Sequence, residues 1–217
     1  MNKFVKWLMQ TSLWTWALKA INNLEYRISG GTPSFAMSDY HKIVDMLSLQ
    51  GSGPYIYTFA TADQSSPIST AIRKLTGGDF NHAGFIFTDV DGLPYAFHVT
   101  TKGLVIEDLL EVLRDTDYIC INKLELTDEN YKKAIQRREH LRSLRNSIKY
   151  DYSITLNDTG DKFYCSEASF FILDGLYYDV DLKPEIIYGR KVFSPYKVTK
   201  LGKVIYNNHP NFTGESK

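Results

Sequence analysis

The chain has 217 residues, 43% of them hydrophobic, which is enough to bury the core of one domain with an extension. Lysine plus arginine and aspartate plus glutamate number 25 each, so the formal net charge is zero. This balance excludes a global field that would recruit nucleic acid or anionic lipid, and no nucleic-acid partner is expected. The two cysteines lack the paired spacing of a disulfide framework or a zinc site, so we interpret both as reduced.

The N-terminal segment MNKFVKWLMQTSLWTWALKAINNL begins with basic residues and continues apolar, as a signal peptide does. However, Gln10, Thr11 and Ser12 interrupt the apolar run, no small-x-small cleavage site is clear, and fewer than about 18 uninterrupted apolar residues are present. We therefore favour a helix that packs on protein over an interfacial membrane helix, and a cytoplasmic location. The apolar residues that fall near one face of this helix are Phe4, Leu8, Trp14, Leu18 and Ile21.

The next part of the chain alternates helical and strand patterns between turn signals. In chain order we expect a helix over 39–49, a strand over 55–61, a helix over 65–78, two strands joined by a turn over 83–100, a strand-like run over 103–109 and a strand over 117–126. The helix over 65–78 is well punctuated, because Pro67 occupies its first turn and Gly77 and Gly78 end it. Cys120 lies within the strand over 117–126 and is expected to be buried there.

A long amphipathic helix is expected over 127–148, with Thr127 as its N-cap. We interpret its basic face as solvated rather than as a site for an anionic partner. That face carries Lys132, Lys133, Arg137, Arg138, Arg142 and Arg145. A cysteine-bearing helix and a strand over 203–208 follow, and the order of helices and antiparallel strands indicates an α+β fold rather than repeating βαβ units.

The stretch DKFYCSEASFFILDGL places Cys165 at the start of an apolar helix. Ala168, Phe171 and Ile172 follow at helical spacing, and Gly175 can end the helix. Unpaired N–H groups and the helix dipole stabilise a thiolate in the first turn, so we expect a depressed pKa for Cys165. The alternative is that Cys165 is a small hydrophobic residue at the start of a core helix.

Two histidines on neighbouring strands are candidate partners for this cysteine. His82 begins an apolar strand, and small Ala83 and Gly84 behind it leave room for a substrate or a second helix. His98 lies on the next strand. The other three histidines, His41, His140 and His209, lie in the N-terminal extension, on the basic helix face and in a polar tail, and are not expected in a site.

The length of the loop between these strands decides whether the two imidazoles share a face. A two-residue Asp91-Gly92 turn would place them on opposite faces of the sheet. A three-residue loop over 90–92 pairs Gly84 with His98 instead, so that His82 and His98 become diagonal neighbours on one face. We predict this second register, because a shared site needs both imidazoles on one face.

The segments NHAGFIF, a second strand after a DG-containing turn, GLVIEDLLEVL, YDYSI and FYCSEASFFI resemble, in this order, the circularly permuted papain-like amidases of the NlpC type. The resemblance covers about residues 51–205. It implies a papain-like α+β fold in which an antiparallel sheet packs against the helix that carries the nucleophile. It also implies Cys165 as the nucleophile, His82 as the base and His98 as the orienting residue, a position that is often a carboxylate or an amide in relatives.

The resemblance and the residues together predict a cysteine-dependent hydrolase that cleaves an amide bond, of a peptide or cell-wall type, through an acyl-enzyme. The backbone N–H of Cys165 would serve as an oxyanion donor, Glu167 is interpreted as structural, and no metal or organic cofactor is expected. We assign 1–50 to a helical extension and 51–217 to the catalytic domain. The candidates for a substrate-groove wall are Tyr150, Tyr152 and Tyr164, with core packing as the alternative for each.

Two other functions remain open from the sequence. One is a lipid-directed thiol acyltransferase or esterase similar to the lecithin:retinol acyltransferase-like proteins, which would take an acyl-lipid substrate and could use the N-terminal helix for membrane contact. The other is a binding module that has kept the fold and lost turnover, which an intact set of cysteine, histidine and polar partner disfavours.

Overall fold

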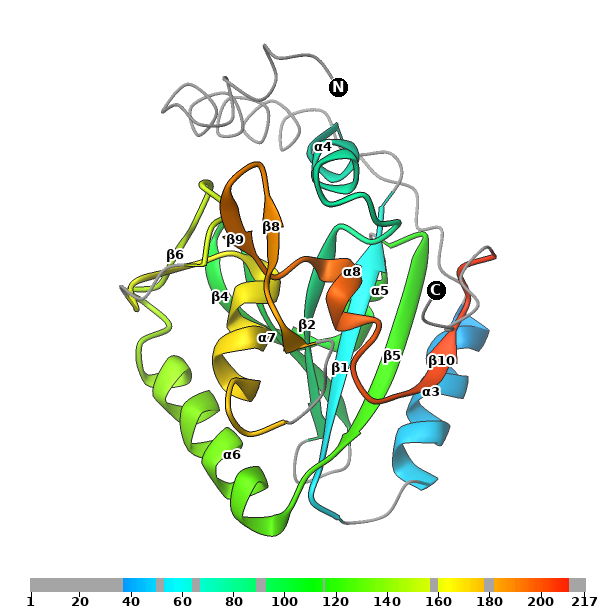
Figure 1. The fold of residues 1–217 in the computed structure, drawn as a ribbon. Helices are drawn as coiled ribbons and strands as arrows, with labels where there is room; N and C mark the ends of the chain where they lie inside the picture. Colours follow the sequence, from blue (N-terminus) through cyan, green and yellow to red (C-terminus); the bar gives the residue numbers. More distant parts are fainter. Residues whose placement is uncertain are drawn as a thin grey trace.

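Six antiparallel strands form the main sheet, in the order β10-β5-β1-β2-β3-β4 (Figure 1). Their bounds are β1 Tyr55–Ala62, β2 His82–Thr88, β3 Pro94–Thr100, β4 Gly103–Asp108, β5 Tyr118–Glu125 and β10 Lys203–Asn207. The computed structural model describes residues 37–49, 53–63, 67–88, 93–114, 116–156, 160–177 and 182–210. The α+β class expected from the sequence is confirmed, whereas the predicted N-terminal helix lies outside the described residues.

Helices and two small strand pairs complete the described part of the chain. The helices are α3 Met37–Leu49, α4 Pro67–Thr76, α5 Leu109–Arg114, α6 Asp128–Ser143, α7 Cys165–Leu173 and α8 Pro195–Val198. The small pairs are β6 Lys149–Tyr150 with β7 Lys162–Phe163, which are parallel, and β8 Glu185–Ile187 with β9 Arg190–Val192, which form a hairpin. Within these ranges, no helix combines the length and the apolar character that a bilayer span requires.

Strand residues alternate between two cores, one on each face of the sheet. On the face that α7 and α8 cover in Figure 1, Ala83 and Phe85 of β2 belong to a cluster with Ala168 and Ile172 of α7. On the other face, a second cluster joins strand residues to helices α3 and α5. Its buried members are Ile43, Leu47, Phe59, Ile86, Ala96, Leu109, Val112, Leu113, Ile119 and Ile121. Helix α3 falls in the predicted extension, yet it shares this core with the sheet.

Helix α7 packs against β2 and β3, and both of its ends are fixed. At its N-terminus the Glu167 carboxylate accepts a hydrogen bond from the backbone N–H of Tyr164, at 3.2 Å, so the structural role expected for Glu167 is confirmed. Beyond its C-terminus Gly175 has a φ of +68°, the left-handed conformation that glycine adopts most easily and that ends helices. Cys165 is therefore the first residue of a helix with defined termini.

Helix α6 begins as predicted and ends earlier. Thr127 caps it, its Oγ1 accepting from the N–H of Asn130 at 3.2 Å, but the helix stops at Ser143 because the following residues turn to bury Ile148 in the core. Part of the basic face makes contacts within the protein. Arg137 donates to the carbonyl oxygens of Asp174 at 2.6 Å and of two other residues at the end of α7, where the helix dipole favours a cation.

The register of β2 against β3 confirms the odd-length loop. Gly84 lies opposite His98, and the pairing runs on to Thr88 opposite Pro94, while residues 89–92 lie outside the described residues. A Cβ on Gly84 would lie 2.6 Å from Cβ of His98 and 2.8 Å from the ring of Phe59. The glycine therefore makes room for His98, not for a substrate, and Ala83 faces helix α7.

Candidate active site

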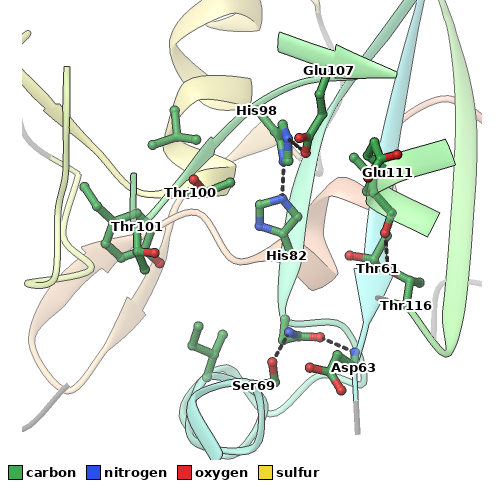
Figure 2. A pocket seen from close by; sticks show the side chains of 15 residues that line it. Thr61, Asp63, Ser69, His82, His98, Thr100, Thr101, Glu107, Glu111 and Thr116 are labelled. Atoms are coloured by element: carbon green, nitrogen blue, oxygen red, sulfur yellow. Dashed lines mark hydrogen bonds and ion pairs between the residues drawn. The ribbon is translucent and has the colours of Figure 1, made fainter. Parts of the chain in front are cut away.

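Three side chains from neighbouring strands form a hydrogen-bonded line at one end of the sheet (Figure 2). His82 is the first residue of β2, and its Nε2 lies 2.7 Å from Nδ1 of His98 in β3. Nε2 of His98 lies 2.9 Å from Oε1 of Glu107 in β4. His98 is only 3% exposed, so its two ring nitrogens find their partners within the protein. The structure thus brings together the two histidines selected from the sequence and adds a carboxylate.

Phe59 packs beside the His82 ring, and hydrogen bonds of the preceding residue hold the backbone at His82 in place. The ring of Phe59 lies 6.0 Å from the ring of each histidine, centroid to centroid. The preceding residue, Asn81, is buried and donates to Ser69 Oγ at 2.5 Å, while its Oδ1 accepts from the backbone N–H of Asp63 at 2.9 Å. These two bonds tie the start of β2 to α4 and to the end of β1.

The thiol of Cys165 lies against the backbone of β2, one residue from His82. Described pairing between β2 and β3 stops at Gly84, whereas β1 pairs with β2 as far as His82, so β2 and β3 separate at this end. The backbone N–H groups of Ala83 and Ser166 hydrogen-bond the sulfur and lower its pKa. Cys165 is 3% exposed, however, and burial outweighs these donors and raises the pKa of the thiol to about 11.

This value corrects the expectation of a partly ionised Cys165. Helix N-terminal N–H groups do act on the sulfur, but desolvation of a charge in a covered site is the larger effect. The pKa of His82 is also displaced, well below 6.5, by burial and then by the neighbouring charge of His98. At neutral pH the pair is therefore a neutral thiol and a neutral imidazole, and no hydrogen bond joins these two described side chains.

A pocket of about 290 Å³ opens beside the histidines (Figure 2). Its lining includes His82, His98, Glu107 and Tyr150, together with Asp63 and Glu111. Cys165 does not line this pocket. Tyr150 connects the two places, since it lines the pocket and lies near enough to Cys165 for a charge there to raise its pKa, after the larger effect of burial.

The three tyrosines proposed as a groove wall have different positions. Tyr150 lies in the pocket wall, and Tyr152 packs edge-to-face against it, with ring centroids 4.9 Å apart. Tyr164 is 1% exposed, and its hydroxyl oxygen accepts from the N–H of Phe193 at 2.8 Å. Tyr164 is thus a core residue, the alternative that the sequence left open, and we do not assign it to substrate binding.

The remaining predicted residues lie away from this site. Cys120 is fully buried in β5 with a pKa raised to about 12 by burial, and both cysteines are free. His41 and His140 are exposed on α3 and α6, and His209 packs against Phe80. The two histidines that lie in contact, His82 and His98, are thus the two selected from the sequence.

Glu107 and Asn81 are the site residues that the sequence analysis missed. A signal for Glu107 was present, because a two-residue turn between Thr100 and Gly103 pairs Ala96 with Glu107 and places the carboxylate diagonally beside His98. The signal for Asn81 was weaker, since its role depends on a contact with Ser69, on a different element.

These features define an α+β protein with a cysteine at a helix N-terminus beside a line of two histidines and a glutamate. No protein-family model and no curated protein sequence matches the chain significantly. Among solved structures, the chain is similar to the metalloprotein yiiX from Escherichia coli O157:H7, DUF1105, with a TM-score of 0.53 and 16% sequence identity. The similarity covers 73% of this chain and 98% of that chain, and at this identity it supports the fold alone.

In the part of the chain that the structure describes, no group of three or more His, Cys, Asp and Glu side chains is placed to hold a metal ion. The ring nitrogens that join His82 to His98 and the oxygen that joins His98 to Glu107 are directed at one another. The described arrangement is thus a line of groups that can hold protons in defined positions.

Proposed function

We propose that the protein is a cysteine-dependent hydrolase of the permuted papain-like type that cleaves an amide bond in a peptide or cell-wall-type substrate. One observation carries the proposal. The Cys165 sulfur, at the first residue of α7, accepts a hydrogen bond from the backbone of Ala83, next to a histidine whose Nε2 is held by a second histidine. A nucleophile, a base and a group that orients the base are the three parts of such a mechanism.

The displaced pKa values determine how the first step proceeds. A preformed thiolate–imidazolium pair is unfavourable in this covered site, because burial disfavours the charged form of both Cys165 and His82. The thiol therefore attacks the carbonyl carbon as His82 accepts its proton, by general-base catalysis. The base nitrogen is Nδ1, since Nε2 bonds to His98, and it must come within hydrogen-bond reach of the sulfur when substrate binds.

The remaining steps of the reaction need water as the only further reactant. Attack forms the S–C bond and an oxyanion, for which the backbone N–H of Cys165 at the helix start is a donor. Collapse breaks the C–N bond, and the leaving amine takes the proton from His82, which leaves a thioester on Cys165. Water, deprotonated by His82, then hydrolyses the thioester and restores the thiol.

The pocket beside the histidines offers hydrogen-bonding groups to a substrate. Most of the residues that line it carry a hydroxyl, amide, carboxylate or imidazole group, although carbon atoms make up the larger part of its surface; Ile72, Val99 and Val112 are the aliphatic members. A fatty acyl chain needs a continuous apolar channel, whereas a peptide finds hydrogen-bond partners in this lining. This composition supports amide cleavage as the first choice.

A substrate panel tests the proposal. Wild-type protein would be incubated with cell-wall-type peptides, simple peptides and phospholipid esters, and products identified by mass spectrometry. We expect amide cleavage that disappears in Cys165→Ala and falls about 10²-fold or more in His82→Ala. His140→Ala, at an exposed histidine on α6, is the control and should keep full activity. Cleavage that survives Cys165→Ala would reject the proposal, and turnover of lipid esters alone would favour the acyltransferase or esterase alternative.

A further inference from the structure

Glu107 ends the line of side chains that begins at His82, and its position follows from the strand register. The turn between β3 and β4 pairs His98 with Val105 and Ala96 with Glu107, so His98 and Glu107 are diagonal neighbours on one face. The Glu107 side chain is 35% exposed and lines the pocket, while His98 beside it is almost fully buried. Glu107 and His82 are thus the partly exposed ends of a line whose middle member, His98, is buried.

A carboxylate at this end restricts where the imidazole protons lie. An ionised carboxylate only accepts hydrogen bonds, so Nε2 of His98 must carry a proton that it donates to Glu107. In a neutral His98 ring Nδ1 then has a lone pair, which accepts from Nε2–H of His82. A neutral His82 with its proton on Nε2 has its lone pair on Nδ1. For two neutral rings, the opposite placement would set a lone pair against the carboxylate.

We propose that Glu107 is a positioning residue that fixes the tautomers of both histidines and so makes Nδ1 of His82 the proton acceptor for Cys165. This assignment rests on the proposed hydrolase only for its catalytic consequence, because the tautomers exist in the protein without substrate. The assignment also predicts which change would move the His82 proton from Nε2 to Nδ1. A protonated His98 would donate from both ring nitrogens, His82 would then carry its proton on Nδ1, and that nitrogen would no longer accept a proton.

The charges around Glu107 come from several elements. Hydrogen bonding to His98 is the largest effect that lowers the pKa of Glu107, and the charges of His98 and Lys102 lower it further against the opposing effect of burial. Glu111 of α5, Asp63 at the end of β1 and Tyr150 of β6 line the same pocket. Glu107 is the carboxylate in hydrogen-bond contact with the histidine pair.

Nitrogen-15 NMR of histidine-labelled protein tests the proton positions directly. At about pH 7.5 we expect His82 and His98 of the wild type both to carry the proton on Nε2. Glu107→Ala should leave His98 with mixed tautomers. Glu107→Gln, whose amide oxygen still accepts from Nε2–H, should restore the Nε2–H form. Glu125→Gln, at an exposed carboxylate ending β5, is the matched control and should change neither ring.

Kinetics give the second readout. Loss of the correct tautomer lowers kcat by up to about 10⁴-fold in a serine-protease triad, so we expect Glu107→Ala to lower kcat by on the order of 10² or more, and Glu107→Gln to recover part of it. A wild-type His82 with its proton on Nδ1, or unchanged tautomers in Glu107→Ala, would overturn the proposal for Glu107. Absence of hydrolysis with the expected tautomers would reject the hydrolase and leave the tautomer assignment supported.

Discussion

Replacing Gly84 by alanine would test whether close packing holds the two histidines together. The new Cβ would lie 2.6 Å from Cβ of His98, against an ordinary carbon separation of about 3.5–4.0 Å, so relief requires a movement of about 1 Å. Cβ of His98 is attached to the backbone of β3 and cannot rotate away. Movement of His98 by about 1 Å would extend its 2.7 Å contact with His82 beyond hydrogen-bond range. Overpacking of this kind lowers the free energy of unfolding by about 1–3 kcal/mol.

Urea denaturation and steady-state kinetics would measure both effects of Gly84→Ala. We expect the stability loss above and a fall in kcat of about tenfold or more, because misplacement by about 1 Å can cost as much as 10²-fold. Gly77→Ala is the control, since Gly77 precedes β2 and has a φ of +68°, but nothing lies within 4 Å of the Cβ that alanine would add. It should lose about 1–2 kcal/mol of stability and keep kcat. A Gly84→Ala protein as stable and active as the wild type would refute the packing argument.

Three further predictions concern stability. Tyr164→Phe removes the hydroxyl that accepts from Phe193 and leaves a buried N–H unpaired, so urea denaturation should show a loss of about 1–3 kcal/mol; an unchanged midpoint would contradict it. Arg137→Met removes the α6 cation that binds the carbonyl oxygens at the end of α7 and should lower the free energy of unfolding by about 1–2 kcal/mol. Lys132→Met, at an exposed position of α6, should lower it little, and equal losses in the two variants would contradict a role of Arg137 in capping α7. Because the pKa of His82 is lowered in the folded protein, the unfolded chain binds a proton at His82 more readily than the folded chain does. The contribution of neutral His82 to the free energy of unfolding is therefore present above about pH 6.5 and is lost as the pH falls. The wild type should therefore lose more stability than His82→Gln between about pH 7 and pH 5, and parallel pH profiles would argue against a displaced pKa.

Features that local chemistry determines were predictable from the sequence. The start of α7 at Cys165 and its end near Gly175 follow from apolar spacing and from the ease with which glycine adopts a left-handed conformation. Strand alternation limits the pairing to two alternatives, and the one that places His98 opposite Gly84 was chosen because a shared site needs both imidazoles on one face. These two results were sufficient to place a cysteine helix and a histidine pair at the same sheet.

Features that depend on burial or on distant contacts were not predictable. The ionisation of Cys165 was predicted wrongly because the helix N-terminus is visible in the sequence, whereas the chain that covers the thiol is not. Tyr164 lies in the core because its hydroxyl bonds a backbone group 29 residues away. Helix α5 and the β8–β9 hairpin were also missed, since their short segments carry too few residues for a clear period.

The covalent intermediate on Cys165 is the most direct test of the account. A reaction with a cleaved peptide substrate would be quenched in acid during turnover and analysed by intact mass and peptide mapping. We expect the peptide that contains Cys165 to carry the added mass of the acyl fragment. Hydroxylamine should remove this adduct, as it removes a thioester, and the adduct should be absent from Cys165→Ala. Product formation with no adduct on Cys165, or with an adduct on another residue such as Cys120, would contradict the proposed role of Cys165 as the nucleophile.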